Sequence, residues 1–308
     1  NTLVKNLLNN SSFSNRYLLF FKKIDTNPEL IKFSMIVEFF KRLKNIYQSG
    51  GGYLVNELWN VNRHEHSIGT MILSLKFNGN IEEQIKALLH DISHTAFSHV
   101  IDYILKNENE DYHEKIQEDF LNDEELLSIL GKYNLNIKRI MSKNYSFLDN
   151  ELPELSFDRI DYTLRDLFRQ KRISHKDVRE IVNNLAVYQN KLCFNSLEIG
   201  KWFQKLYFQE VVEYFQDPLN MYINTMLCNL LTSALNEEII QLQDFNFTDE
   251  YIIKKINSSS KKKELEDIIN KKKYDDFLLL KEKIKVKKRY IDPYIFVNNE
   301  IKRISEIK

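Results

Sequence analysis

The chain has 308 residues, of which 43% are hydrophobic and 29% are charged, so it has the composition of a globular protein with a sizeable core. Lysine plus arginine and aspartate plus glutamate number 44 each. This balance does not indicate a nucleic-acid partner, although a local basic groove is compatible with it. Only two cysteines, no signal-peptide pattern and no apolar run of about 20 residues predict a cytoplasmic protein that does not span a membrane.

The helical spacing of apolar residues predicts a mostly α-helical fold, because only 7 glycines and 4 prolines are available for turns. The predicted helical parts are the first fifty residues up to Gly50–Gly52, and then residues 62–122, 126–140, 152–168 and 201–235. Alternating side chains in residues 187–194 predict a short strand or hairpin that turns at Gln189 and Asn190.

The composition changes at about Asp244, after which the chain is rich in lysine and glutamate. We therefore predict a core domain over residues 1–243 and a small α+β subdomain over residues 244–308. Acidic residues alternate with the lysines, which favours solvated helix faces over a nucleic-acid site. β-Branched and aromatic residues around Asp292 and Pro293 predict strands near the end of this subdomain.

Six of the seven histidines lie within fifty residues, at positions 64, 66, 90, 94, 99 and 113, together with acidic residues. Imidazole and carboxylate groups in combination suit divalent metal ions. His90 and Asp91 are adjacent, and His94 follows them along the same edge of a predicted helix. The His-Asp pair alone is more often a capping aspartate beside a core histidine, so its companions decide the interpretation.

Two flanking motifs supply these companions, RHEHSIG at residues 63–69 and DRIDYTLRD at residues 158–166. With them, the sequence resembles the HD superfamily, in which one histidine, a His-Asp pair and a distant aspartate bind a metal. The resemblance implies a helical core that encloses one divalent ion, which could be Mn, Fe, Mg, Zn or Ni. The implied metal ligands are His66, His90, Asp91 and Asp158.

Further motifs narrow this resemblance to the deoxynucleoside triphosphate triphosphohydrolases, without the sterile-alpha-motif domain of the mammalian enzyme. The matching segments are RLKNIYQSGGGYLV (42–55), HDISHTAFSHVID (90–102), YHE (112–114) and VKKRYIDPYIFVNNEIKRISE (286–306). The resemblance implies water attack at the α-phosphate of a dNTP, with a deoxynucleoside and inorganic triphosphate as products. It also implies a homo-oligomer, either a dimer or a tetramer.

The same resemblance gives a role to each matching residue. His113 would be the general acid that protonates the leaving oxygen, and Asp102 would orient its ring. The phosphate groups would be bound by Arg63, His94, His99, Arg159 and Tyr162. Gln48 and Asp166 would bind the sugar 3′-hydroxyl, and Tyr222 would pack under the sugar. The acids beside the motifs, Glu65 and Asp161, are expected to support the ligands or to form salt bridges.

Departures from the family leave alternatives open. Lys41 and Lys44 stand where the family has glutamine and arginine, so activation by a guanine nucleotide is not implied. Ser49 and Leu54 replace larger residues, which leaves the base preference open, and no arginine for the terminal phosphate matches around residues 215–222. The alternatives are a phosphohydrolase of another nucleotide (a monophosphate, a cyclic or a signalling nucleotide) and a non-catalytic nucleotide-sensing or nucleic-acid-binding protein.

Overall fold

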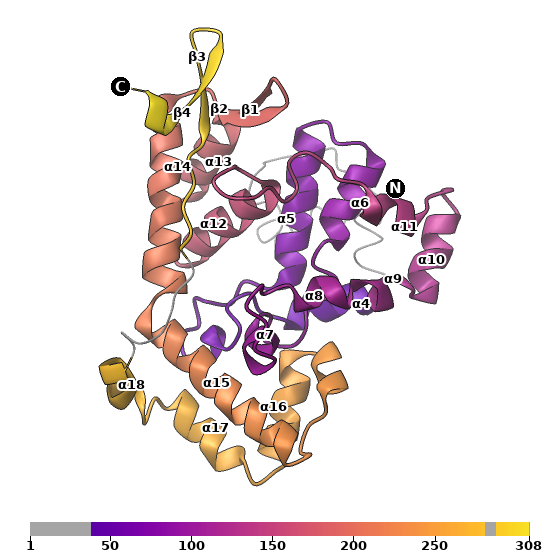
Figure 1. The fold of residues 1–308 in the computed structure, drawn as a ribbon, viewed down its shortest axis with the longest axis vertical. Coiled ribbons are helices and arrows are strands. Elements are labelled where there is room, and N and C mark those ends of the chain that lie inside the picture. Colours follow the sequence, from indigo (N-terminus) through magenta and orange to yellow (C-terminus); the bar gives the residue numbers. More distant parts are fainter. Residues whose placement is uncertain (1–37, 281–287, 308) are drawn as a thin grey trace.

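The computed structural model describes residues 38–280 and 288–307, and most of these residues form helices, with one small sheet at one end of the molecule (Figure 1). The prediction of a mostly α-helical fold with a few short strands and a small C-terminal α+β part is therefore confirmed. The helices expected before residue 38 lie outside the described residues.

Helices that are short except for α5 (Arg63–Lys76) form the part of the chain that contains the histidine cluster. They are α4 (Glu38–Arg42), η1 (Leu43–Asn45), η2 (Gly52–Leu54), α5 (Arg63–Lys76), α6 (Ile81–Leu89), α7 (Val100–Ile104), α8 (Tyr112–Lys115), α9 (Gln117–Leu121), α10 (Glu124–Gly131) and α11 (Ile137–Ser142). The elements labelled η are 3₁₀-helical turns, except η3, which is a π-helical turn.

Longer helices and the strands follow. They are α12 (Phe157–Arg169), α13 (His175–Asn184), β1 (Leu185–Tyr188), β2 (Lys191–Phe194), α14 (Leu197–Glu210), η3 (Val211–Phe215), α15 (Pro218–Asn236), η4 (Leu242–Asn246), α16 (Asp249–Asn257), α17 (Lys262–Ile269), α18 (Tyr274–Leu280), β3 (Tyr294–Val297), β4 (Glu300–Arg303) and η6 (Ile304–Glu306). Among the described helices, none combines the length and apolar composition that crossing a membrane requires.

Polar residues determine where the helices around the histidine cluster begin. At the start of α5, the Asn62 side chain accepts a hydrogen bond from the Glu65 N–H. Ser156 accepts one from the Arg159 N–H at the start of α12, and Asn80 caps α6 in the same way. Each such cap stabilises its helix by about 1 kcal/mol and fixes the start of the helix that carries the candidate ligands.

The four strands form one sheet in the order β1-β2-β3-β4. β1 and β2 form the predicted hairpin, and its turn residues Gln189 and Asn190 both have positive φ. β2 then pairs in parallel with β3, with Cys193 opposite Tyr294, and β3 pairs antiparallel with β4. The sheet therefore joins strands from both sides of residue 244, and the domain boundary at that residue stays a prediction.

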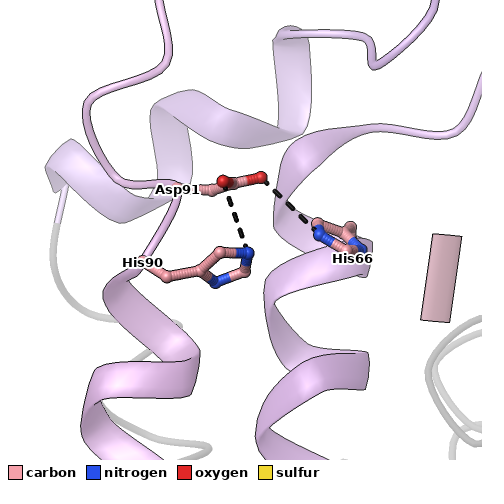
Figure 2. Close-up of side chains that lie close together, drawn as sticks. All are labelled: His66, His90 and Asp91. Carbon is pink, nitrogen blue, oxygen red and sulfur yellow. Dashed lines mark ion pairs between the residues drawn. The ribbon is translucent and has the colours of Figure 1, made fainter. Parts of the chain in front are cut away.

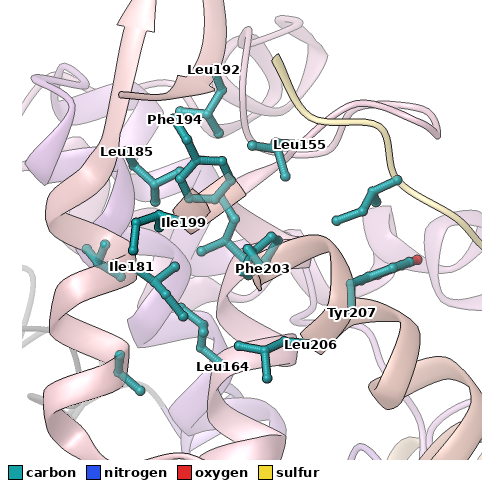
Figure 3. Packing of buried hydrophobic residues seen from close by; sticks show 14 of the residues in the cluster. Leu155, Leu164, Ile181, Leu185, Leu192, Phe194, Ile199, Phe203, Leu206 and Tyr207 are labelled. Atoms are coloured by element: carbon teal, nitrogen blue, oxygen red, sulfur yellow. The ribbon is translucent and has the colours of Figure 1, made fainter. Parts of the chain in front are cut away.

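Three groups of buried apolar side chains hold these elements together. The first packs α12, α13 and α14 against the sheet, and Figure 3 shows Leu164 and Phe203 inside it. The second joins α5 and α6 to α9, α10 and α11, and the third joins α15 to α7, α16 and α17. α5 lies between the first two groups, because Leu73 belongs to one and Ile72 to the other.

The segment between α6 and α7, residues 90–99, is held from two sides. Arg42 donates hydrogen bonds of 2.7 and 2.8 Å to two backbone carbonyls of this segment. Asp249, at the start of α16, accepts a hydrogen bond of 2.7 Å from the Phe97 N–H. A half-buried cation and a buried carboxylate from distant parts of the chain thus fix the backbone that carries three of the clustered histidines.

We expect Leu164→Ala to lower the free energy of unfolding by about 2–5 kcal/mol, because the Leu164 side chain is fully buried and its removal leaves a cavity. Urea unfolding followed by circular dichroism measures this change. The matched control is Leu279→Ala, in a side chain that is 83% exposed, where we expect a change below about 0.5 kcal/mol. Equal losses in the two variants would contradict the packing described for α12.

Candidate metal centre

His66 lies fully buried on α5, at the centre of the candidate site. Its Nδ1–H donates to Asp161 Oδ2 at 2.8 Å, and its Nε2 lies 2.9 Å from Asp158 Oδ1. The two aspartates are three residues apart, which puts both on one face of α12. Burial lowers the pKa of His66, but its hydrogen bonds to Asp158 and Asp161 outweigh burial and raise this pKa to about 10. The site therefore favours positive charge.

His90 and Asp91 occupy the turn after α6, because that helix ends at Leu89, and not the helix wall that the sequence predicted. His90 Nδ1–H donates to the Ala87 carbonyl at 2.8 Å, which directs Nε2 toward the other candidate ligands. This Nε2 lies 3.3 Å from Asp91 Oδ1, and Asp91 Oδ2 lies 3.7 Å from His66 Nε2. Figure 2 shows the three side chains converging from α5 and from the end of α6.

The donor atoms of this group fit a divalent metal ion. One ligand atom from each of His66, His90 and Asp91 lies within 4.8 Å of the other two, and Asp158 Oδ1 lies 3.7 Å from His90 Nε2. Imidazole suits Mn, Fe, Zn and Ni, and carboxylates complete their coordination. Asp161 binds the far nitrogen of His66, as carboxylates commonly do behind metal-binding histidines. The structure thus brings all four predicted ligands together.

Three further histidines predicted from the sequence, His94, His99 and His113, lie beside Asp91. The rings of His94 and His113 stack with centroids 3.8 Å apart, and the His99 ring meets both of them edge-on. His94 Nε2 lies 3.4 Å from Asp91 Oδ1, which connects this cluster to the candidate ligands. Burial, together with the nearby His99, lowers the pKa of His113 to about 4. His113 therefore needs negative charge nearby in order to hold a proton at neutral pH.

Asp102 hydrogen-bonds His99, whereas the sequence paired it with His113. Its carboxylate accepts hydrogen bonds from His99 Nδ1 at 3.1 Å, from Asn107 Nδ2 at 2.6 Å and from the Tyr112 N–H at 3.0 Å. The reason is local, because His99 and Asp102 are three residues apart at the start of α7. Within the described chain, the buried Nδ1 of His113 has no hydrogen-bond partner.

Arg63 fixes the orientation of Asp91. One of its terminal nitrogens donates to Asp91 Oδ2 at 2.7 Å, and its Nε donates to Ser98 Oγ at 3.0 Å. Burial raises the pKa of Asp91, but the neighbouring His90 and Arg63 outweigh burial and hold this pKa well below its usual value. Asp91 therefore carries a negative charge, which a metal ligand requires.

A cavity of about 260 Å³ adjoins this group. The predicted site residues that line it are Gln48, Arg63, His99, Asp158, Tyr162 and Asp166. Sequence reasoning assigned no role to several other lining residues, namely Tyr103, Tyr214, Phe215, Asn220, Asn224 and Arg289. Asn220 and Asn224 are four residues apart on α15, and this spacing could have indicated from the sequence that they share one face of a helix. The π-helical turn that brings Tyr214 and Phe215 to the cavity has no such signal.

Two residues that line the cavity, Gln48 and Asp166, have buried polar groups whose hydrogen-bonding and charge are not balanced by neighbours. The buried Oε1 of Gln48 has no hydrogen-bond partner within the described residues. Burial is the main cause that raises the pKa of Asp166 to about 7, and it also raises the pKa of the neighbouring, fully buried Glu210. Two buried carboxyl groups this close disfavour ionisation of both at once, so the pair favours holding a proton.

Four residues that the sequence placed at the substrate do not line this cavity, namely His94, His113, Arg159 and Tyr222. The Arg159 guanidinium donates to the backbone carbonyls of Glu154 at 2.6 Å and Asn150 at 3.1 Å, on the loop that precedes α12. Tyr222 is fully buried in the third core group, where its hydroxyl donates to the Ile268 carbonyl at 3.3 Å. The face of α15 that carries Tyr222 packs on α17, away from the candidate ligands.

Comparison with known proteins agrees with this geometry. Residues 63–184 match the family model of the HD domain. The Bacillus subtilis protein YdhJ, which is described as uncharacterized, is 38% identical over 279 residues, or 88% of this chain and 84% of YdhJ. The chain belongs to the HD-domain superfamily. All four candidate ligands lie inside its HD domain, whereas Gln48 and Arg289 lie outside the matched residues.

Two other proteins resemble this HD-domain chain. The metal-dependent phosphohydrolase cns2 of Cordyceps militaris is 32% identical over 183 residues, which cover 59% of this chain and 53% of cns2. The crystal structure of a hypothetical protein from Aquifex aeolicus has a TM-score of 0.70, covering 90% of this chain and 87% of that protein. Its sequence identity is 21%, so this likeness shows the fold alone.

We expect Asp161→Asn to weaken Mn²⁺ binding by about 10–100-fold, because the substitution removes the carboxylate that orients His66 without removing a ligand. Isothermal titration calorimetry with Mn²⁺ on the full chain measures the affinity. Asp158→Ala, which removes a candidate ligand, should abolish the binding.

The control for this experiment is Asp276→Asn, at an exposed residue of α18, which should bind Mn²⁺ like the unsubstituted chain. Thermal unfolding of each variant tests whether it folds. If Asp161→Asn folds and binds Mn²⁺ with unchanged affinity, the supporting role of Asp161 is wrong.

Proposed function

We propose that this HD-domain chain is a metal-dependent phosphohydrolase that hydrolyses a deoxynucleoside triphosphate to a deoxynucleoside and inorganic triphosphate. The observation that carries the proposal is the composition of one cavity wall. It combines the candidate ligand Asp158 with the cationic group of Arg63, the imidazole of His99, and the hydroxyl-binding groups of Gln48 and Asp166. The name of the relative cns2, a metal-dependent phosphohydrolase, supports the general reaction.

In this proposal, the divalent ion is held by His66, His90, Asp91 and Asp158. When bound, the ion supplies positive charge that polarises a phosphoryl oxygen and lowers the pKa of a water molecule. His99 in the cavity wall and His94 behind it would donate hydrogen bonds to the α-phosphate. Arg63 holds Asp91 in place and lines the same cavity, so its charge also stabilises the phosphate chain.

His113 would act as the general acid. The bond from phosphorus to the 5′-oxygen breaks as water adds to phosphorus, and the leaving oxygen takes a proton from the His113 ring. Burial keeps the pKa of this ring low in the free protein. The negative charge of a bound phosphate would raise this pKa, so that His113 would be protonated when substrate is present.

The sugar would lie against Gln48 and Asp166. The amide oxygen of Gln48 and the carboxyl oxygens of Asp166 can both accept hydrogen bonds, which suits a hydroxyl donor on the ligand. Tyr214 and Phe215 add aromatic surface to the same wall. The stacking role that the sequence gave to Tyr222 is not part of this proposal, because that side chain lies in the core.

A second candidate function is hydrolysis of another nucleotide, such as a monophosphate. One observation favours it, because the Arg159 guanidinium, which was expected to bind the phosphate chain, donates its hydrogen bonds to backbone carbonyls instead.

The expected homo-oligomer, a dimer or a tetramer, stays a prediction.

Incubation with each dNTP, NTP and dNMP plus Mn²⁺, followed by chromatographic separation of the products, distinguishes these functions. We expect inorganic triphosphate and a deoxynucleoside from dNTPs, and no turnover when EDTA replaces Mn²⁺. Orthophosphate released from monophosphates alone would support the second candidate and contradict the first. Absence of turnover with every nucleotide would contradict both.

We expect His113→Ala to lower kcat by about 10²–10⁴-fold while Mn²⁺ and nucleotide affinity stay near those of the unsubstituted chain, because it removes a proton donor and not a ligand. Steady-state kinetics and calorimetry measure the two effects. His175→Ala, at the start of α13 and outside the histidine cluster, is the matched control and should keep full activity. Near-normal kcat in His113→Ala would show that the acid is another group.

A further inference from the structure

The cavity receives one cation from the C-terminal segment of the chain, Arg289. The backbone next to it is held firmly, because Ile291 is buried and its carbonyl accepts a hydrogen bond of 2.8 Å from Gln204 on α14. The Asp292 N–H donates to the Pro153 carbonyl at 3.0 Å. Figure 1 shows this segment, which precedes β3, running along α14. The hydrogen bonds of Ile291 and Asp292 therefore hold the backbone that places Arg289 at the cavity.

The Arg289 side chain lies between an aromatic ring and a carboxylate. Its guanidinium carbon is 5.5 Å from the centroid of the Phe215 ring, which itself lines the cavity. One terminal nitrogen lies 3.0 Å from Glu110 Oε2, and the exposed fractions of the two side chains are 32% and 18%. Partly exposed ion pairs of this kind are weak, so a ligand with more negative charge can replace the carboxylate.

Of the two arginines that line the cavity, Arg289 has more hydrogen-bond donors left for a ligand. Within the described lining residues, the arginines are Arg63 and Arg289. Arg63 is occupied by Asp91 and Ser98 at 2.7 and 3.0 Å. Arg289 uses one of its two terminal nitrogens on Glu110, and most of its five N–H donors remain for a ligand.

We propose that Arg289 binds the outer phosphate groups of a nucleoside polyphosphate, and that Glu110 is its resting partner, which the phosphate displaces. This inference rests on the proposed phosphohydrolase function and sharpens its substrate class, because a monophosphate held at the metal ligands has no outer phosphate to offer. A guanidinium binds two phosphate oxygens in parallel, and its contact with Phe215 keeps the planar group oriented. The cation stays paired before and after binding, so it is never left without a counter-charge.

The test measures binding of inorganic tripolyphosphate and of orthophosphate to the full chain by calorimetry, without metal. Arg289→Ala should weaken tripolyphosphate binding by about 10–100-fold, the range expected for hydrogen bonds to a charged group. Glu110→Gln should strengthen it by about two- to tenfold, because the competing carboxylate is gone. Orthophosphate binding should change less than about twofold in both variants.

The matched control is Lys288→Ala, which removes the same charge one residue away, from an exposed side chain that does not line the cavity. It should leave tripolyphosphate binding unchanged. Arg289→Lys keeps the positive charge but loses the two parallel hydrogen-bond donors of the guanidinium. It should weaken binding less than Arg289→Ala does. If Arg289→Ala does not fold, the lysine variant is used for the test in its place. A purely structural ion pair would make Arg289→Ala and Glu110→Gln change binding in the same direction.

The inference is overturned if the unsubstituted chain does not bind tripolyphosphate, if Lys288→Ala matches Arg289→Ala, or if Glu110→Gln weakens binding as much as Arg289→Ala does. These results would leave the proposed hydrolysis intact, because that function is tested separately by product release with Mn²⁺. Conversely, absence of turnover together with the predicted opposite effects of the two variants would contradict the hydrolysis and retain Arg289 as a polyphosphate-binding residue.

Discussion

A buried histidine between two carboxylates determines how the two helices that frame the site meet. His66 on α5 binds Asp161 with one ring nitrogen and Asp158 with the other, both on α12. Arg165 donates to the two oxygens of Asp161 at 2.9 and 2.7 Å, so this carboxylate is balanced between an imidazole and a guanidinium. Removing one member of such a buried group leaves an uncompensated charge, which costs about 3–5 kcal/mol. The contacts that orient His66 toward the other candidate metal ligands therefore also join α5 to α12.

This arrangement requires a close approach, which Gly69 permits. A Cβ atom at Gly69 would lie 1.7 Å from Asp161 Oδ1, closer than any real contact. Gly69 is three residues after His66, so it lies on the same face of α5. The motif RHEHSIG thus contains both the ligand and the space that its supporting carboxylate occupies. A larger residue at Gly69 would push α12 away and move Asp158 out of reach of His66.

Most of the candidate centre could be predicted from the sequence, because His66, Asp158 and Asp161 lie in short motifs that resemble those of the HD superfamily. The pairing of Asp102 differs from the prediction, because His99, three residues before it, hydrogen-bonds its carboxylate, whereas the position of His113 depends on how the chain turns between α7 and α8. The contact surface of Tyr222 also escaped prediction. The π-helical turn before α15 holds an extra residue, which changes the direction of the residues around it and brings Tyr214 to the cavity instead. Arg289 arrives from a distant segment, which no local pattern reveals.

The parallel pairing of β2 with β3 has a consequence for how the protein is made. β2 leaves the ribosome long before β3, and at about 5–20 residues per second the intervening chain takes several seconds to appear. During that time, Phe194 lacks its partner Ile295, and one edge of β2 has no strand beside it. An open edge of this kind is the part of a nascent chain most prone to pair with another molecule. Productive synthesis therefore depends on keeping this edge of β2 from pairing with another molecule until β3 and β4 emerge.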